Sequence, residues 1–197
     1  RNNCRINCLS RNLGNIYSNQ GEQDRAKEAY LKSAETYQKI GNLNGVARNL
    51  CNLATAYHEE RDYQRALIIL EKGLNIFRKS KKLTGVYQIT GNIGISYYLS
   101  YKNFDRRDSV FHLIPGSRNA LIRESIRLLK EAVGMAQQSE DIDALSQFGQ
   151  SLAQAYEDIG DLTHAYTYFK IYTSAKDSLY SISSRQEIEK LTTEREL

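Results

Sequence analysis

The sequence predicts an all-α fold in which four helix pairs stack as a solenoid and a further helix follows the last pair. One string occurs four times, at intervals of 40, 40 and 59 residues, and a constant interval of this size is typical of stacked helical repeats. A single proline and no tryptophan among 197 residues also fit a helical array. The four copies are Leu13-Gly14-x-x-Tyr17, Leu53-Ala54-x-x-Tyr57, Ile93-Gly94-x-x-Tyr97 and Leu152-Ala153-x-x-Tyr156.

Each copy continues into a second predicted helix. Nine residues after the tyrosine comes a small residue, and a bulky residue follows four positions later. In the third copy this pair is displaced by 19 residues, the same amount by which the third interval exceeds the others, so one insertion explains the irregular spacing. The pairs are Ala26 and Tyr30, Ala66 and Leu70, Ser125 and Leu129, and Ala165 and Phe169.

Short turn signals separate the predicted helices. Within units an acidic residue occupies the expected N-cap position, in Gly21-Glu22, Arg61-Asp62 and Gly160-Asp161. Between units, similar linkers occur at residues 41–45, 81–85 and 140–144, and we expect the next helices to be capped by Asn44, Thr84 and Asp143.

These signals divide the chain into a solenoid at residues 1–183 and a connecting helix at residues 184–197. The units span about residues 4–43, 44–83, 84–142 and 143–180, and the third contains the insertion at 105–119. Pro115 lies in this insertion beside an apolar run, and a loop of this length in a compact array is usually either functional or mobile.

The pattern resembles the tetratricopeptide repeat, in which two antiparallel helices approach closely at three small residues. The resemblance covers roughly residues 5–180 and implies a right-handed α-α superhelix. The family's tryptophan and closing proline are missing, and without the proline the second helix can run longer than in a repeat of about 34 residues. The small positions hold Gly14, Ala54, Gly94 and Ala153, then Ala26, Ala66, Ser125 and Ala165, then Ser33, Gly73 and Ala132, with Tyr172 in the fourth copy.

The resemblance implies a protein- or peptide-binding module whose first helices line a concave groove. Two residues before the first small position lies an asparagine in three copies and a serine in the fourth, and an amide offers a donor and an acceptor to a peptide backbone. Similarly placed asparagines clamp a peptide main chain in kinesin light chains. The alternative is that these asparagines bond to the neighbouring helix and fix the stacking. The predicted groove residues are Asn12, Asn15, Arg48, Asn49, Asn52, Gln88, Asn92, Gln150 and Ser151.

The sequence offers no recognisable catalytic centre, so we expect no enzymatic activity, cofactor or metal in this fragment. No histidine lies beside a nucleophile motif, and no glycine-rich phosphate loop is present. Cys4 and Cys8 are four residues apart, but no second pair with zinc spacing exists, and Cys51 is expected in the core. We expect His58 and His164 at the surface, near helix boundaries.

One segment accounts for the net charge of +4. Residues 102–130 hold seven basic and three acidic residues, which fits a solvated face that contacts an acidic partner. A nucleic-acid partner is not expected, because it would require a continuous basic stripe with interleaved aromatic residues. Membrane contact within the fragment is not expected either, because no run of 18 apolar residues occurs.

The tail resembles the end of the repeat region in bacterial sensor histidine kinases, where a string like Lys176-Asp177-Ser178-Leu179 leads into a charged helix. This resemblance implies an excised fragment, the sensory domain of a two-component system, with the periplasmic side of a membrane-anchored sensor favoured over the cytoplasm. One alternative is a scaffold that forms a homodimer through the C-terminal helix; another is the peptide-binding domain of a cytosolic transcription regulator. The apolar residues available for the helix contact are Leu179, Ile182, Ile188 and Leu191.

Overall fold

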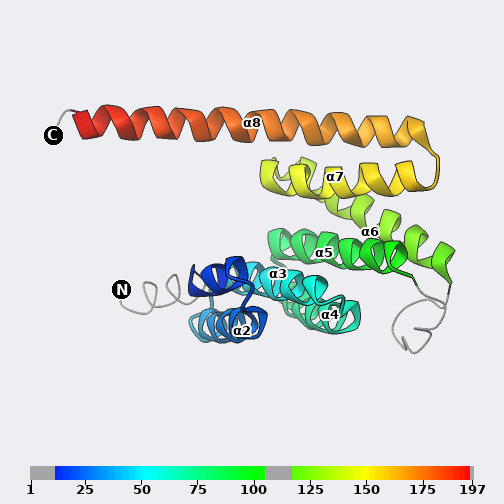
Figure 1. Ribbon diagram of the computed structural model, residues 1–197, viewed down its shortest axis with the longest axis horizontal. Coiled ribbons are helices and arrows are strands. Elements are labelled where there is room, and N and C mark those ends of the chain that lie inside the picture. Colours follow the sequence, from blue (N-terminus) through cyan, green and yellow to red (C-terminus); the bar gives the residue numbers. More distant parts are fainter. Residues whose placement is uncertain (1–11, 105–116, 196–197) are drawn as a thin grey trace. The chain divides into compact units, whose positions relative to one another are not determined.

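The computed structural model describes residues 12–104 and 117–195, which are helical apart from short turns and contain no strand (Figure 1). The predicted all-α fold is therefore confirmed. The first described helical segment comprises residues 12–19. The labelled helices are α2 (Gln23–Lys39), α3 (Leu43–Glu59), α4 (Tyr63–Ser80), α5 (Leu83–Lys102), α6 (Arg118–Gln138), α7 (Ile142–Asp158) and α8 (Leu162–Arg195).

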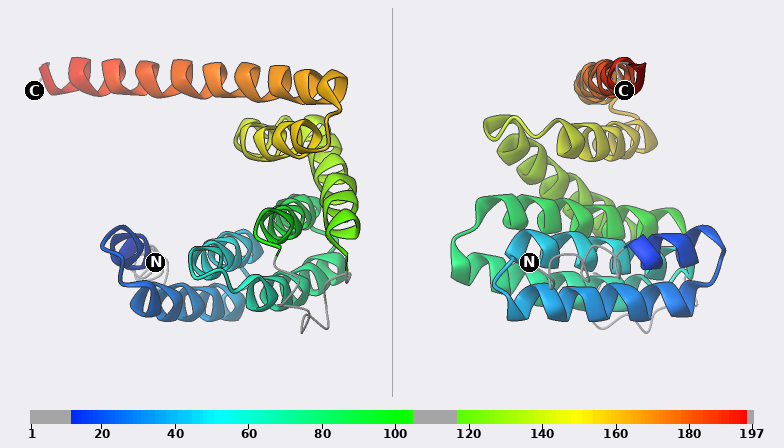
Figure 2. Two further views of the ribbon diagram at one scale, coloured as in Figure 1. Left: turned by 45° about the vertical axis from the view of Figure 1, so that its right-hand side comes forward. Right: turned by 90° about the vertical axis from the view of Figure 1, so that its left-hand side faces the viewer.

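The helices form two compact units, Arg1–Ala132 and Val133–Leu197, and the boundary between them lies within α6. In the first unit, the segment 12–19, α3 and α5 lie in one layer, and α2 and α4 lie in a second layer (Figure 2). In the second unit, α7 and α8 pack side by side in opposite directions (Figure 1).

Small residues occupy the sites where helices approach most closely, as predicted. A methyl group at Gly14 would lie 2.6 Å from the Tyr30 ring, and one at Gly94 would lie 2.8 Å from Leu129. The hydroxyl of Ser125 donates a hydrogen bond of 2.8 Å to the carbonyl oxygen of Gly94, which joins α6 to α5. The predicted small residues with no exposed surface are Ala26, Ser33, Ala54, Ala66, Ser125 and Ala132.

Six turns share one backbone conformation. In each, the residue two positions before the new helix has a positive φ, between 52° and 81°, and only one further residue separates it from that helix. Glycine adopts a positive φ without steric cost, whereas other residues do so at the expense of stability. The residues with positive φ are Gly21, Gly41, Arg61, Lys81, Glu140 and Gly160.

The N-caps predicted between units were wrong by two residues. The N-caps are Asn42, Lys82 and Asp141, so the predicted Asn44, Thr84 and Asp143 lie two residues further along the chain, inside the helices. The predicted N-caps within units were correct for Glu22 and Asp62. The physical reason is that the chain turns sharply at the left-handed residue, so its immediate successor is already the N-cap of the next helix.

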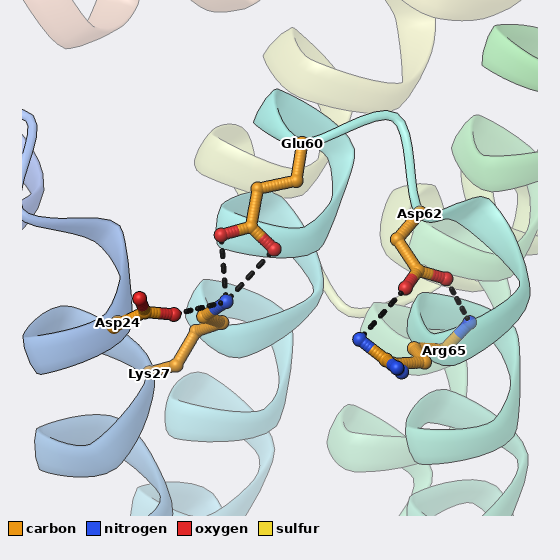
Figure 3. Close-up of polar contacts among 5 residues, drawn as sticks. All are labelled: Asp24, Lys27, Glu60, Asp62 and Arg65. Atoms are coloured by element: carbon orange, nitrogen blue, oxygen red, sulfur yellow. Dashed lines mark hydrogen bonds and ion pairs between the residues drawn. The ribbon is translucent and has the colours of Figure 1, made fainter.

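The N-cap of α5 offers a test of this turn. The Asp62 side chain accepts a hydrogen bond of 3.0 Å from the backbone N–H of Arg65 (Figure 3). The Lys82 side chain, by contrast, makes no such capping bond. We expect Lys82→Asp to raise the free energy of unfolding by about 1 kcal/mol, because it supplies an acceptor at the positive end of the helix dipole. Urea denaturation measures the change. Asp62→Lys is the matched control and should lose a similar amount; equal stability of all three chains would contradict the assignment.

The predicted insertion and tail are only partly described. Residues 105–116 of the insertion, with Pro115, lie outside the described residues, between the end of α5 and the start of α6. The predicted connecting helix continues α8 without a break as far as Arg195. Across the described ranges, no helix combines the length and apolar character that crossing a bilayer requires.

Candidate binding surface

The structure divides the nine predicted groove residues into buried and accessible ones. Asn49 and Asn92 are buried, with exposed fractions of 0% and 4%. Asn12, Asn15, Arg48 and Gln150 are exposed, and Asn52, Gln88 and Ser151 are partly buried. Asn12 to Asn92 belong to the first unit, whereas Gln150 and Ser151 lie on α7 in the second.

The two buried asparagines bond to protein groups. The Nδ2 group of Asn92 donates to the carbonyl oxygen of Gln88, at 2.8 Å, and to the sulfur of Cys51 on α3, at 3.3 Å. Burial raises the pKa of the Cys51 thiol to about 12, so the sulfur remains a neutral acceptor. Asn49 donates to the carbonyl oxygen of Gly45 at 2.8 Å within its own helix. At Asn92 the structure therefore matches the alternative in which an asparagine fixes the stacking of helices.

A second polar contact joins α3 to α5. The Nε2 atom of His58 lies 2.8 Å from the hydroxyl oxygen of Ser96, and that hydroxyl donates to the carbonyl oxygen of Asn92 at 2.9 Å. Because the single proton of Ser96 is committed to Asn92, His58 must be the donor, with its proton on Nε2. Burial lowers the pKa of His58 to about 4. His58 is partly buried, whereas a surface location was expected, and His164 is exposed as expected.

Two accessible amides lie across neighbouring helices in the first layer. The Oδ1 atom of Asn15 accepts hydrogen bonds from the Tyr30 hydroxyl, at 2.9 Å, and from the Nδ2 group of Asn52, at 3.3 Å. These bonds fix the orientation of both amides. Within the described part of the chain, the Nδ2 group of Asn15 and the Oδ1 atom of Asn52 have no hydrogen-bond partner. The pair therefore presents one donor and one acceptor at the surface.

Lys27 fixes α2, which carries Tyr30, against the end of α3 (Figure 3). Its ammonium group lies 2.6 Å from a carboxylate oxygen of Glu60 and 2.9 Å from one of Asp24. Burial disfavours the charged form, but the bonds to Glu60 and Asp24 outweigh it and raise the pKa of Lys27. The same ammonium lies 5.2 Å from the centre of the Tyr57 ring. These contacts hold α2, whose Tyr30 bonds to Asn15, against α3, which carries Asn52.

The role of Tyr30 was not predicted. Its place in the repeat indicated a bulky packing residue, and the ring is indeed buried, with 4% exposure. Its hydroxyl nevertheless reaches the amide of Asn15 and orients it. A repeat pattern specifies the size of the residue at this position, whereas the contact of its hydroxyl depends on the path of the facing helix.

The chain was compared with known families and structures. A family model described as Tetratricopeptide repeat matches residues 5–79. The fold is similar to the crystal structure of BtubC (BKLC) from P. vanneervenii, with 19% sequence identity and a TM-score of 0.60, over 89% of this chain and 65% of BtubC. This chain thus spans about 65% of the length of that relative. A comparison with curated proteins found no match.

Two further crystal structures are similar at lower TM-scores. RapI in its apo form shares 18% identity, with a TM-score of 0.43, over 85% of this chain and 67% of RapI. MamA shares 17% identity, with a TM-score of 0.44, over 89% of this chain and 94% of MamA. Residues 5–79 thus match the tetratricopeptide-repeat family, and the layered helix pairs have the fold of such repeats, which suggests a protein–protein interaction module.

Proposed function

We propose that this chain binds an extended segment of a partner protein along the first-layer surface formed by residues 12–19 and α3. Tetratricopeptide-repeat proteins are typically non-catalytic scaffolds, and this proposal assigns no chemical step to the chain. The supporting observation is the pair of the exposed Asn15 and the partly buried Asn52, whose free Nδ2 and Oδ1 groups match the acceptor and the donor of a peptide unit.

Two exposed residues that flank Asn52 on α3 are polar. Arg48 lies one turn before Asn52 on α3, and Thr55 lies about one turn after it, and both are exposed. Arg48 can bind a carboxylate of the partner through two parallel hydrogen bonds. Backbone recognition by the amides and an acidic side chain near Arg48 together define the expected ligand, an extended peptide with at least one acidic residue.

Peptides selected from a random library on the immobilised chain test this assignment. Fluorescence anisotropy then gives the affinity of a selected peptide for each variant. We expect Asn52→Ala to weaken binding about three- to tenfold, because one hydrogen bond contributes roughly 0.5–1.5 kcal/mol. Asn15→Ala combined with Asn52→Ala should weaken it further.

Asn75→Ala is the matched control, since Asn75 is an exposed asparagine on α4 in the second layer. It should leave the affinity unchanged. Circular dichroism must show that the double variant stays folded, because Asn15 also accepts the Tyr30 hydroxyl. Equal affinities of the original chain and the folded double variant would refute the proposed surface.

The finer role that we propose is the sensory domain of a bacterial two-component signalling protein. Two features support it: the tail string Lys176-Asp177-Ser178-Leu179 and the unbroken α8, which is 34 residues long and can carry a change in the repeats to a further domain. The coding sequence downstream of residue 197 tests this role. A membrane span followed by a kinase domain would support it, whereas a helix-turn-helix domain or a stop codon would contradict it.

A further inference from the structure

A row of large apolar side chains lies uncovered along one face of α8. Leu162, Tyr166, Phe169 and Tyr180 are 69%, 64%, 50% and 77% exposed. Their spacing of four, three and eleven residues places all four on the same side of a helix, with Thr173 between them. We call this face the α8 stripe. Isolated exposed apolar residues are common, but an aligned row of four is typical of an interaction surface.

The α8 stripe is separate from the side of α8 that packs on α7. The Tyr168 ring stacks on Tyr156 of α7, with 5.6 Å between ring centres, and Gly149 of α7 lies against the backbone of Tyr172. Ala165 and Ala175 are buried on the same side. At 1.5 Å per residue α8 is about 51 Å long and α7 about 26 Å, so α8 extends well past its neighbour (Figure 1).

Charged residues border the stripe in a self-complementary way. The ammonium group of Lys170 lies 4.8 Å from the centre of the Tyr166 ring, at one border of the stripe. Asp177 is exposed seven residues later, which places it on the same border. The opposite border carries Lys176, whose ammonium is bonded to the Tyr172 hydroxyl at 3.1 Å. One border thus holds both a positive and a negative charge.

We propose that the α8 stripe binds the α8 stripe of a second copy of this chain, with the two helices antiparallel. A two-fold axis lying in the contact and perpendicular to the helices turns each border toward the same border of the partner. Centred near Thr173, this arrangement places Tyr166 opposite Tyr180 of the second copy, and Lys170 opposite its Asp177. The axis generates each of these pairs twice. The proposal does not depend on the peptide-binding surface on the first unit.

A parallel pair fits the charges less well. In that arrangement the border with Lys170 faces the opposite border of the second copy, where another positive charge, Lys176, lies. Like charges placed opposite each other destabilise a helix pair. Charge complementarity therefore favours the antiparallel pair.

The area that the α8 stripes can bury determines the expected affinity of the dimer. Three aromatic side chains and one leucine from each copy bury on the order of 1,000 Å² in total, which is at the low end for specific interfaces. We therefore expect a dimer with a dissociation constant in the micromolar range.

Sedimentation velocity of the full chain over a range of micromolar concentrations tests the proposal. We expect a monomer–dimer equilibrium that Tyr180→Ser weakens about tenfold or more, because it removes a central contact made twice. Lys170→Glu alone should weaken the dimer, and Lys170→Glu combined with Asp177→Lys should restore it. The double variant should restore the dimer only if residue 170 of one copy pairs with residue 177 of the other, as the antiparallel contact requires.

Ile182→Ser is the matched control. Ile182 is 44% exposed, but its position places it on the other side of α8, so its loss should leave the dimer unchanged. A chain that stays monomeric throughout the concentration range would overturn the proposal. So would a dimer that Ile182→Ser disrupts and Tyr180→Ser does not, because the contact would then lie on the face that holds Leu179 and Ile182.

Discussion

Replacing Gly85 with alanine is expected to lower the free energy of unfolding by about 2–4 kcal/mol. A methyl group on Gly85, in the first turn of α5, would overlap the ring of Phe77 on α4. Phe77 has no exposed surface, so its ring cannot move aside without disturbing the core. The gain in helix propensity from glycine to alanine, about 1 kcal/mol, is too small to offset this overlap. Urea denaturation followed by circular dichroism measures the loss.

Two further variants isolate the cause. Gly134→Ala in α6 is the matched control, because no atom lies within 4 Å of the added methyl group, and it should stabilise the chain by about 0.5–1 kcal/mol. Phe77→Leu should make Gly85→Ala less costly, since a smaller side chain leaves room for the methyl group. Additive losses for Gly85→Ala and Phe77→Leu would show that the overlap is not the cause.

The chain is expected to lose up to about 3 kcal/mol of stability between pH 6.5 and pH 4 because of His58 alone. The pKa of His58 is about 4 in the folded chain, below its ordinary value of 6.5. The unfolded chain therefore binds more protons than the folded chain between these pH values. Stability falls as the pH decreases through this window, and the contribution is fully present above pH 6.5.

His58→Gln separates this effect from the titration of carboxylates. Glutamine has an amide donor that can reach Ser96, but it does not titrate, so the variant should lose less stability than the original chain on acidification. The free energies of unfolding at pH 7 and pH 4.5, measured in urea, give the two losses. Identical losses would show that His58 is already charged in the folded chain.

The sequence was sufficient to predict the helix pairs and the small residues between them. This succeeded because close helix approach requires a small side chain at one position, and the requirement recurs with every repeat. The predicted caps between units failed because Asn44 and Thr84 are good N-cap residue types, and residue type alone gave the wrong position. The signal that would have located them is Gly41-Asn42, which repeats the pattern of Gly21-Glu22.

The candidate binding surface was harder to predict from the sequence. The asparagine row was a regular feature of the sequence, yet Asn92 is buried against Cys51 whereas Asn52 is accessible and bonds to Asn15. Equivalent positions differ because more of α5 than of α3 is buried, and burial depends on the neighbouring units. The low pKa of His58 could not be predicted for the same reason, because it results from burial by neighbouring helices and not from the local sequence.

The shared conformation of the six turns has a consequence for the evolution of the chain. Deleting residues 43–82 would join Asn42 to Leu83, and Asn42 already follows a left-handed glycine and caps a helix that begins with leucine. The new junction would be the same as an existing one. Duplication of the same stretch would likewise create only junctions that the chain already contains. Unequal recombination can therefore lengthen or shorten this protein by whole units without requiring a new turn.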